Sequence, residues 1–370
     1  KEYRRQRQMC IRDRSRAAYM PLDMHLLHAH GVVVQVALFV NCVQDDIALL
    51  ALRTLALLAQ SRTFRATDRF GGTLHRQSMN RLVGVLVMTD EAERVKAGVL
   101  GWLEALRGMS GDVEALAAAA ATLGEPEADE EGAAAATAPG DATAAIARAL
   151  LDLLLENTQR TSEAPNIAHL LLGFDLRAAR DEDQLVDADA RGRPASVLGA
   201  LVALLRPPSG GAAATADAEV HHGAALAEAA PALAERGYAL LHQLCVHPYT
   251  SAATLRYLRT RGEFVLRQVV YAPLRVPPSP GVALPHAALG RVVYPGGEAV
   301  VATAEALLAY LRTLGSTLAL AALELHALAL HGQLPKALPL VGALLGAQAT
   351  TGELEGAQEL LLPPARAAAS

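Results

Sequence analysis

The sequence contains little cysteine, and its cysteines are far apart. The 370 residues include three, Cys10, Cys42 and Cys245, and no C-x-x-C pair. Such a sparse, odd count in a long chain excludes a disulfide framework and is typical of a reducing compartment. Cys42 follows an apolar run and Cys245 falls on an apolar helical face, so we predict both as small core residues.

Aromatic residues and an excess of one charge are also scarce. Aromatics make up 4% of the chain, and the formal net charge is only −5. A protein surface dedicated to nucleic acid normally carries a strong positive bias. We therefore expect no direct contact with nucleic acid.

Motifs that carry chemistry are missing too. The glycine pairs at 71–72, 210–211 and 296–297 lack the spacing and the lysine of a phosphate-binding loop. No G-x-S-x-G element presents a serine nucleophile. The carboxylate run at 127–131 would be uniformly hydrated, whereas acid/base catalysis needs carboxylates in different environments. We predict a chain that is not an enzyme and has no catalytic, cofactor-binding or metal-ligating residue.

Histidines are the remaining candidates for a metal site. His25, His28 and His30 form an H-x-x-H-x-H pattern that would bind zinc or copper if the three rings converged. We favour a helix start in which the rings lie on different faces. His169 lies in an apolar run, and we predict a packing histidine whose hydrogen bonds are satisfied.

Three arginines, Arg256, Arg259 and Arg261, lie close together in the sequence. They would suit an acidic partner segment or a phosphate. The alternative is a solvated helix face with favourable charge near a helix C-terminus. We favour the alternative, because no aromatic residues alternate with these arginines.

What the chain does contain is helix-forming sequence. Hydrophobic residues reach 52%, mostly Ala and Leu, which are strong helix formers. The stretch 238–271 illustrates the pattern, since Leu241, Leu244 and Cys245 form one apolar stripe of helical period that Pro248 ends. Period-2 alternation is rare, which argues against strands. The sequence therefore predicts an all-α protein.

Two more short helices are predicted in this central stretch. Thr250 or Ser251 would cap the second, Gly262 would end it in a left-handed conformation, and Glu263 would open the third at the positive end of its dipole. Each helix has a single apolar stripe, and each buried side chain is worth roughly 1.5–3 kcal/mol. Stacking on neighbours is then strongly favoured, as in an α-solenoid.

The rest of the chain follows the same scheme with irregular spacing. Further helices are predicted at 21–40, 45–58, 78–88, 90–108, 112–124, 142–156, 165–173, 197–205, 298–330 (one helix, or two joined near 315), 334–345 and 353–362, with a loop over 61–74. Because no fixed-length repeat is present, we predict an irregular α-solenoid of HEAT/ARM-like helix pairs. Its predicted parts are a basic segment (1–16), solenoid parts (17–123, 142–206, 223–271 and 298–362), a disordered acidic and Ala-rich insert (124–141), a low-complexity linker (207–222), a Pro/Gly-rich insert (272–297) and a tail (363–370).

Two segments bear on how the chain is anchored and where it begins. The run 31–43 is shorter than the roughly 20 residues a bilayer core requires, and 317–330 contains Glu324 and His326, so we predict a buried solenoid helix there and no transmembrane segment. Residues 1–16 are strongly basic without apolar periodicity. We expect them to be non-native, the alternative being a basic arm or import signal, and we expect the chain to be a piece of a longer protein.

Several strings carry a family resemblance. Residues 238–245 (YALLHQLC), 254–260 (TLRYLRT) and 264–271 resemble the large inner-ring scaffold nucleoporins of the nuclear pore complex, the class named for two hundred and five kilodaltons, or one hundred and ninety-two in fungi. The run 165–174 (PNIAHLLLGF), within 153–176, is the sharpest match. Weaker matches lie at 80–84 and 90–95.

The resemblance implies a structural function. It implies an α-solenoid at the nuclear envelope, part of a large hetero-oligomeric assembly that supports transport of protein and mRNA. Linker nucleoporins would dock into its grooves by short helical motifs. The alternative is a HEAT-like transport receptor or another helical-repeat adaptor, which would share the solenoid but show a more regular two-helix repeat.

Overall fold

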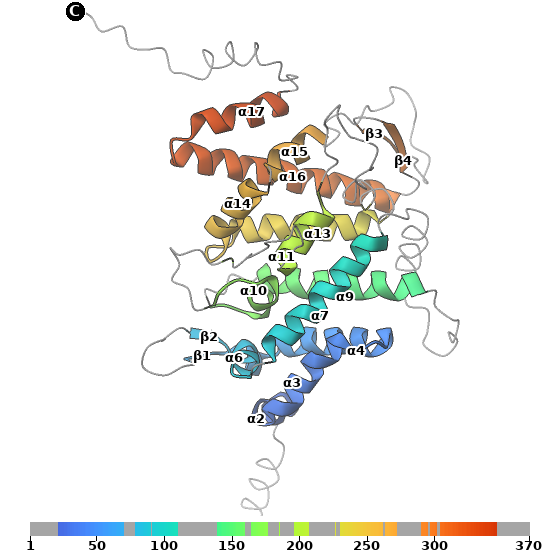
Figure 1. Cartoon of the computed structure of the whole chain (residues 1–370), viewed down its shortest axis with the longest axis vertical. Coiled ribbons are helices and arrows are strands. Elements are labelled where there is room, and N and C mark those ends of the chain that lie inside the picture. Colours follow the sequence, from blue (N-terminus) through green and yellow to red (C-terminus); the bar gives the residue numbers. More distant parts are fainter. Residues whose placement is uncertain are drawn as a thin grey trace, which may run out of the picture.

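Helices stacked along one axis make up the described part of the chain (Figure 1). In this computed structural model the described residues are 21–69, 78–89, 91–109, 139–159, 164–176, 185, 196–206, 226, 230–261, 263–271, 290–294, 297–301 and 304–345. The predicted all-α class is confirmed, because strands in these ranges are few and short.

The N-terminal part runs from the bottom of Figure 1 upwards. Its helices are α2 (Leu22–His28), α3 (His30–Leu38), the 3-10 helix η1 (Phe39–Asn41), α4 (Asp45–Gln60), α5 (Arg62–Arg65), α6 (Arg81–Val87), α7 (Ala92–Met109) and α9 (Pro139–Thr158). The strands β1 (Thr67–Arg69) and β2 (Ser78–Asn80) pair antiparallel.

The C-terminal part continues the stack. Its helices are α10 (Ile167–Leu172), α11 (Val197–Leu204), α13 (Pro231–Val246), α14 (Ser251–Thr260), α15 (Phe264–Tyr271), α16 (Ala304–Leu330) and α17 (Leu334–Leu344). A second antiparallel hairpin joins β3 (Gly290–Tyr294) to β4 (Gly297–Val301).

The long helices lie side by side in succession along the stack, and we call each of them a rung. Helix α4 packs on α9, α9 on α13, α13 on α16, and α16 on α17. Figure 1 shows α7 crossing in front of the lower rungs, and it contacts both α9 and α11. Each rung is therefore covered by the rungs beside it, which is the α-solenoid arrangement.

One stripe of each helix supplies the core. On α4, Leu52 and Leu55 are 0–1% exposed, whereas Leu50 and Leu57 on the other side are 65% and 68% exposed. On α13, the buried stripe includes Leu240, the predicted core residues Leu241 and Leu244, and Cys245. The buried side chains form one continuous apolar cluster from α3 to α17.

Several predicted boundaries differ in the structure. The helix expected over 21–40 breaks at Ala29, where α2 and α3 meet at a bend of 94°. The loop expected over 61–74 contains α5, which Ser61 caps through its side chain, and strand β1. The helix expected at 78–88 begins only after β2.

Parts of the two inserts predicted at 124–141 and 272–297 belong to helices or strands. Residues 139–141, at the end of the predicted disordered insert, belong to α9. Residues 290–301 form the hairpin β3–β4 inside and just after the predicted Pro/Gly-rich insert, so the next helix begins at Ala304 and not at Glu298. Residues 1–16, 110–138, 207–222 and 346–370 lie outside the described part, and with them the elements predicted there.

The central stretch folds into the three predicted helices with different end contacts. Thr250 gives α14 no side-chain cap, because its hydroxyl donates to the Leu244 carbonyl at 2.7 Å. Gly262 lies outside the described residues. The positive φ, 55°, belongs to Glu263, directly before α15.

Helix α16 is one continuous helix through Gly315, and it is less buried than predicted. It packs on α13, α15 and α17. Its segment Leu308–Leu330 is long and apolar enough, by length and composition, to cross a membrane. Leu320 and Ala321 are buried, but Leu311 and Leu318 on another side are 45% and 38% exposed.

Ion pairs and hydrogen bonds connect the layers. Arg259 on α14 donates from Nε to Oε1 of Glu324 on α16 at 2.5 Å, and the Glu324 side chain is only 8% exposed. Trp102 on α7 donates to the Val40 carbonyl at 2.8 Å. Tyr238 on α13 donates to the Gln268 side chain on α15 at 2.7 Å. These contacts fix which helices lie side by side.

The Arg259–Glu324 pair predicts a measurable loss of stability. Arg259→Met leaves a buried carboxylate without its cation, which we expect to lower the free energy of unfolding by about 2–4 kcal/mol. The control is Arg312→Met, because the Arg312–Glu235 pair at 3.1 Å is solvent-exposed, and such pairs contribute at most about 1 kcal/mol. Urea unfolding measures both. Equal losses in the two variants would contradict the structural role of the buried pair.

Candidate functional site

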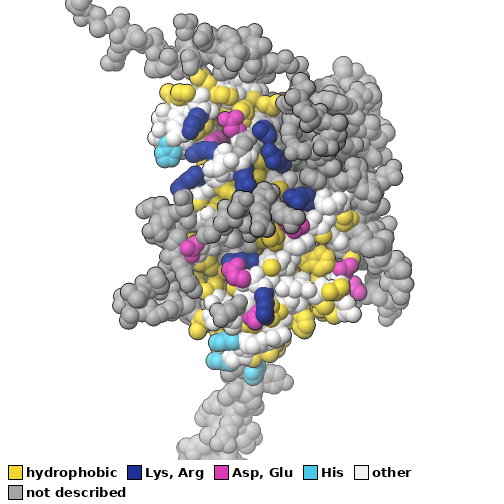
Figure 2. Space-filling view, viewed as in Figure 1, with side chains coloured by type: hydrophobic (Ala, Val, Ile, Leu, Met, Phe, Trp, Pro, Cys, Tyr) yellow, Lys and Arg dark blue, Asp and Glu magenta, His cyan; other side chains and the backbone are white. Residues whose placement is uncertain are grey.

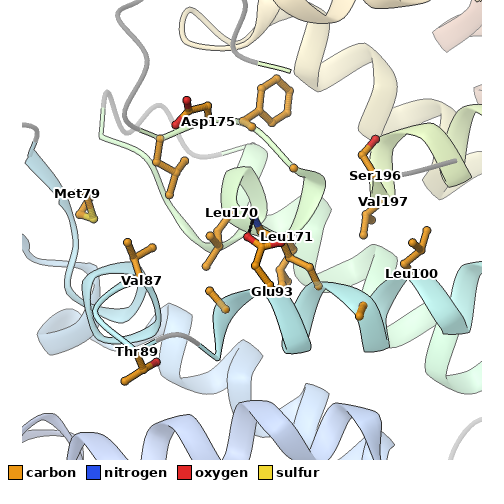
Figure 3. Close-up of a pocket in the computed structure, with 16 residues that line it drawn as sticks. Met79, Val87, Thr89, Glu93, Leu100, Leu170, Leu171, Asp175, Ser196 and Val197 are labelled. Carbon is orange, nitrogen blue, oxygen red and sulfur yellow. Dashed lines mark hydrogen bonds and ion pairs between the residues drawn. The ribbon is translucent and has the colours of Figure 1, made fainter. Parts of the chain in front are cut away.

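A cavity of about 670 Å³ lies between α6, α7, α10 and the start of α11 (Figure 3). We call it the α7–α10 groove. It is lined by Met79, Val87, Thr89, Ala92, Glu93, Lys96, Ala97, Leu100, Leu170, Leu171, Gly173, Phe174, Asp175, Leu176, Ser196 and Val197. Most of these side chains are apolar, and the few charged ones come from α7 and the segment after α10.

Helix α7 forms one wall because it is two-sided. Its buried stripe, with Val95 and Val99, faces the core, whereas Lys96 and Ala97 line the groove. Glu93 and Lys96 form an ion pair at 2.7 Å along this wall, and the Glu93 side chain is 80% exposed. The wall is therefore apolar with one charged pair at its edge.

The opposite wall is α10, a six-residue helix held by its ends. Asn166 caps it: its Oδ1 accepts from the Ala168 N–H at 3.0 Å, and its own N–H donates to Nδ1 of His169 at 3.1 Å. The Asn166 amide also donates to the Asn157 carbonyl of α9 at 2.8 Å. These bonds satisfy free N–H groups of a helix too short to be stable alone.

Gly173 ends α10 in a left-handed conformation, with φ of 92°. A Cβ at this position would lie 3.1 Å from Cβ of Ser196, which caps α11. Glycine is required here both by the backbone and by the close approach of the two segments. After this turn, Asp175 lies beside the groove (Figure 3), and Phe174, which is buried, also lines it.

A buried aromatic cluster lies behind the groove wall. His169 is 0% exposed, and its ring centroid lies 4.9 Å from that of His247 and 5.2 Å from that of Tyr249. The predicted packing role is confirmed, although the prediction of satisfied hydrogen bonds holds for Nδ1 only. Within the described residues, Nε2 of His169 has no hydrogen-bond partner. Burial, with the nearby His247 second, lowers the pKa of His169 to about 3.

The other residues singled out in the sequence are not brought together. His25, His28 and His30 are exposed at the start of the array, and the described residues include no group of three or more His, Cys, Asp or Glu placed to hold a metal ion. Cys245 is buried as predicted, and burial raises the pKa of its thiol well above the usual value. Cys42 is only partly buried, so its assignment to the core is wrong.

The three arginines have different surroundings. Arg259 is engaged by Glu324, Arg261 lies 5.1 Å from the ring centroid of Tyr257, and Arg256 is exposed. The structure therefore does not gather them into one anion site. Arg259 is a structural residue, which neither of the two interpretations from the sequence had anticipated.

Sequence reasoning missed the groove because four separate segments build it. The sequence strings that resemble the family nevertheless contain residues that line the groove. The run 165–174 supplies four lining residues, and the string 90–95 supplies two more on α7. The sharpest match, 165–174, and one weaker match thus meet at one concave surface, whereas the strings in 238–271 do not line it.

Comparison with known proteins gives the class. The family model described as nuclear pore complex scaffold, nucleoporins 186/192/205, matches residues 4–362. The match therefore begins inside the basic N-terminal segment. The chain is also 33% identical to the human nuclear pore complex protein Nup205 over 124 residues, which is 34% of this chain and 6% of that protein.

The chain belongs to the Nup186/192/205 family of nuclear pore complex scaffold nucleoporins, because the family match covers nearly its whole length. The stack of helices in the described residues agrees with that class. That family is the structural scaffold of the nuclear pore complex at the nuclear envelope, and this chain spans only a small part of the length of its human relative.

The tight turn at Gly173 predicts that stability is sensitive to substitution of this glycine. Gly173→Ala places a side chain at positive φ and against Ser196, which we expect to cost about 1–3 kcal/mol of stability. Gly101→Ala is the matched control, because nothing lies within 4 Å of that exposed position inside α7, and alanine there should stabilise by about 0.5–1 kcal/mol. Chemical denaturation compares the two. Shifts of the same sign would contradict this account of the turn.

His169 predicts a dependence of stability on pH. Its pKa in the folded state is lowered from 6.5 to about 3, so the unfolded chain takes up a proton that the folded chain rejects. Stability from this group is complete above pH 6.5 and is lost as the pH falls towards 3, by up to about 1.4 kcal/mol per pH unit. His169→Asn keeps an acceptor for the Asn166 N–H and should flatten the curve between pH 6.5 and 4.5. Parallel curves for variant and wild type would show that His169 does not titrate in this way.

Proposed function

We propose that this chain is a stiff segment of the inner-ring scaffold, and that the α7–α10 groove docks a short amphipathic helix from a linker region of another nucleoporin. The observation that carries the proposal is the groove itself, a concave surface lined mostly by apolar side chains, with a charged edge, and formed by packed helices. Such a surface suits helix-in-groove recognition, in which apolar side chains at i, i+3 and i+4 enter and charges remain at the rim.

Two features of the groove support a docking role. Its wall residue Ala97 is exposed on α7 and is therefore available to a partner, and Leu100 beside it is partly buried. Its second wall, α10, is fixed by the Asn166 and Gly173 contacts, so the groove exists before a partner arrives. Preformed sites lose less conformational entropy on binding.

The transport-receptor alternative is less well supported. Such receptors were expected to show a regular two-helix repeat, whereas helix lengths here range from four residues in α5 to 27 in α16. The family match also favours the scaffold. As a segment covering a small fraction of its human relative, the chain would provide one docking position among several on the whole protein.

The groove is tested with a peptide array and two matched variants. Overlapping 20-residue peptides from the linker regions of the other nucleoporins of the same pore are titrated against the purified chain by fluorescence anisotropy. Ala97→Trp fills the groove, and we expect it to weaken a binding peptide at least about tenfold, or ~1.4 kcal/mol. Ala105→Trp, exposed on the same helix away from the groove, should bind like wild type.

Two outcomes would overturn the docking role. One is an array in which no peptide binds the wild-type chain. The other is a peptide whose affinity is equal for wild type, Ala97→Trp and Ala105→Trp, which would place its site elsewhere.

A further inference from the structure

Helix α16 carries an apolar stripe that no described element covers. Leu308, Leu311 and Leu318 are 47%, 45% and 38% exposed. Together with the partly buried Leu325 they follow a spacing of three, seven and seven residues along the helix. The positions that complete the heptad pattern are all small: Gly315, Ala322 and Ala329.

This pattern is that of a helix–helix seam. Residues spaced alternately three and four apart form one face of a helix, which is the spacing that packs against a second helix. Small residues between the leucines leave holes into which the knobs of a partner helix fit. A surface helix that packs only on its other sides would not need such a stripe. The buried side of α16, with Thr317, Ala321 and Glu324, is a separate face.

Within residues 308–345 the exposed charged side chains are basic, although Arg312 also pairs with Glu235 of α13 at 3.1 Å. Within residues 308–345 the only carboxylate is Glu324, which is buried and paired with Arg259. Arg312 and Lys336 are exposed on α16 and α17. Figure 2 shows Lys and Arg side chains gathered over the α14–α16 region, with few acidic ones among them. An amphipathic helix with acidic flanks is the partner that fits.

The chain itself contains such a segment. In residues 353–362 (ELEGAQELLL), Leu354, Ala357 and Leu361 fall at i, i+3 and i+7, and the other face carries Glu355 and Glu359. Thr350, three residues before Glu353, matches the capping-box signature of a helix start. The family match extends to residue 362, so it includes this segment.

The segment is within reach of the stripe. Figure 1 shows α17 returning over α16 and ending above its middle in this view. The seven residues 346–352 span up to about 25 Å, and a ten-residue helix is about 15 Å long, against about 40 Å for α16. We propose that residues 353–362 dock as a helix on the α16 stripe and act as the next rung of the ladder.

Hydrogen exchange measured by mass spectrometry on the full chain tests this docking. Wild type should show amides of 353–362 exchanging at least about tenfold more slowly than in Leu311→Gln/Leu318→Gln, which removes the apolar contacts without a helix breaker. Leu354→Gln/Leu361→Gln changes the docking segment instead of helix α16, and it should lose the same protection. The control is Leu50→Gln/Leu57→Gln on α4, two leucines that are more exposed, at 65% and 68%, and lie off the stripe, and it should exchange like wild type.

Three outcomes would overturn the proposal. Exchange of 353–362 in wild type at the rate of an unstructured peptide would mean that the segment does not dock. Protection that survives Leu311→Gln/Leu318→Gln would place its contact elsewhere. Protection that disappears on dilution, together with a dimer mass by light scattering, would mean that a second copy covers the stripe. None of these outcomes bears on the α7–α10 groove, which is tested separately.

Discussion

The structure depends on one constraint, which is that no helix in the chain can cover its own apolar stripe. Helix α4 illustrates it, since Leu52 and Leu55 are almost fully buried in a helix that packs on α9, η1, α3 and α5. Each such side chain contributes roughly 1.5–3 kcal/mol when buried, so a rung without its neighbour would lose most of its stability. The ladder from α4 to α17 follows from satisfying this constraint repeatedly along one axis.

Polar residues in the array hold helix ends and set which rungs meet. Asn166 caps α10 and also bonds to α9, and Gly173 lets the chain turn within contact of Ser196. These structural roles account for the residues of the family-like run 165–174 without a catalytic function. A scaffold that presents grooves needs short connecting elements in fixed positions, and this turn places one wall of the α7–α10 groove.

The sequence predicted the fold class and most of the long helices, because their stripes are periodic over several turns. Predictions from the sequence were less accurate where a structural feature depends on contacts between residues far apart in the chain. The break at Ala29 lies two residues before Gly31, but a single glycine in an apolar run does not by itself indicate a helix end, and the strand β1 acquires its identity only by pairing with β2. The pairing of Arg259 with Glu324 joins residues 65 positions apart, and the groove draws on four segments. None of these contacts has a local signature.

The scaffold role proposed for this chain requires that the full-length protein is a fixed structural part of the nuclear pore complex. The most direct test is to tag the endogenous full-length protein and follow it in living cells by photobleaching. A punctate nuclear rim whose fluorescence recovers only over hours is the predicted result. A diffuse pool that exchanges between nucleus and cytoplasm within minutes would contradict the scaffold role and favour a transport receptor.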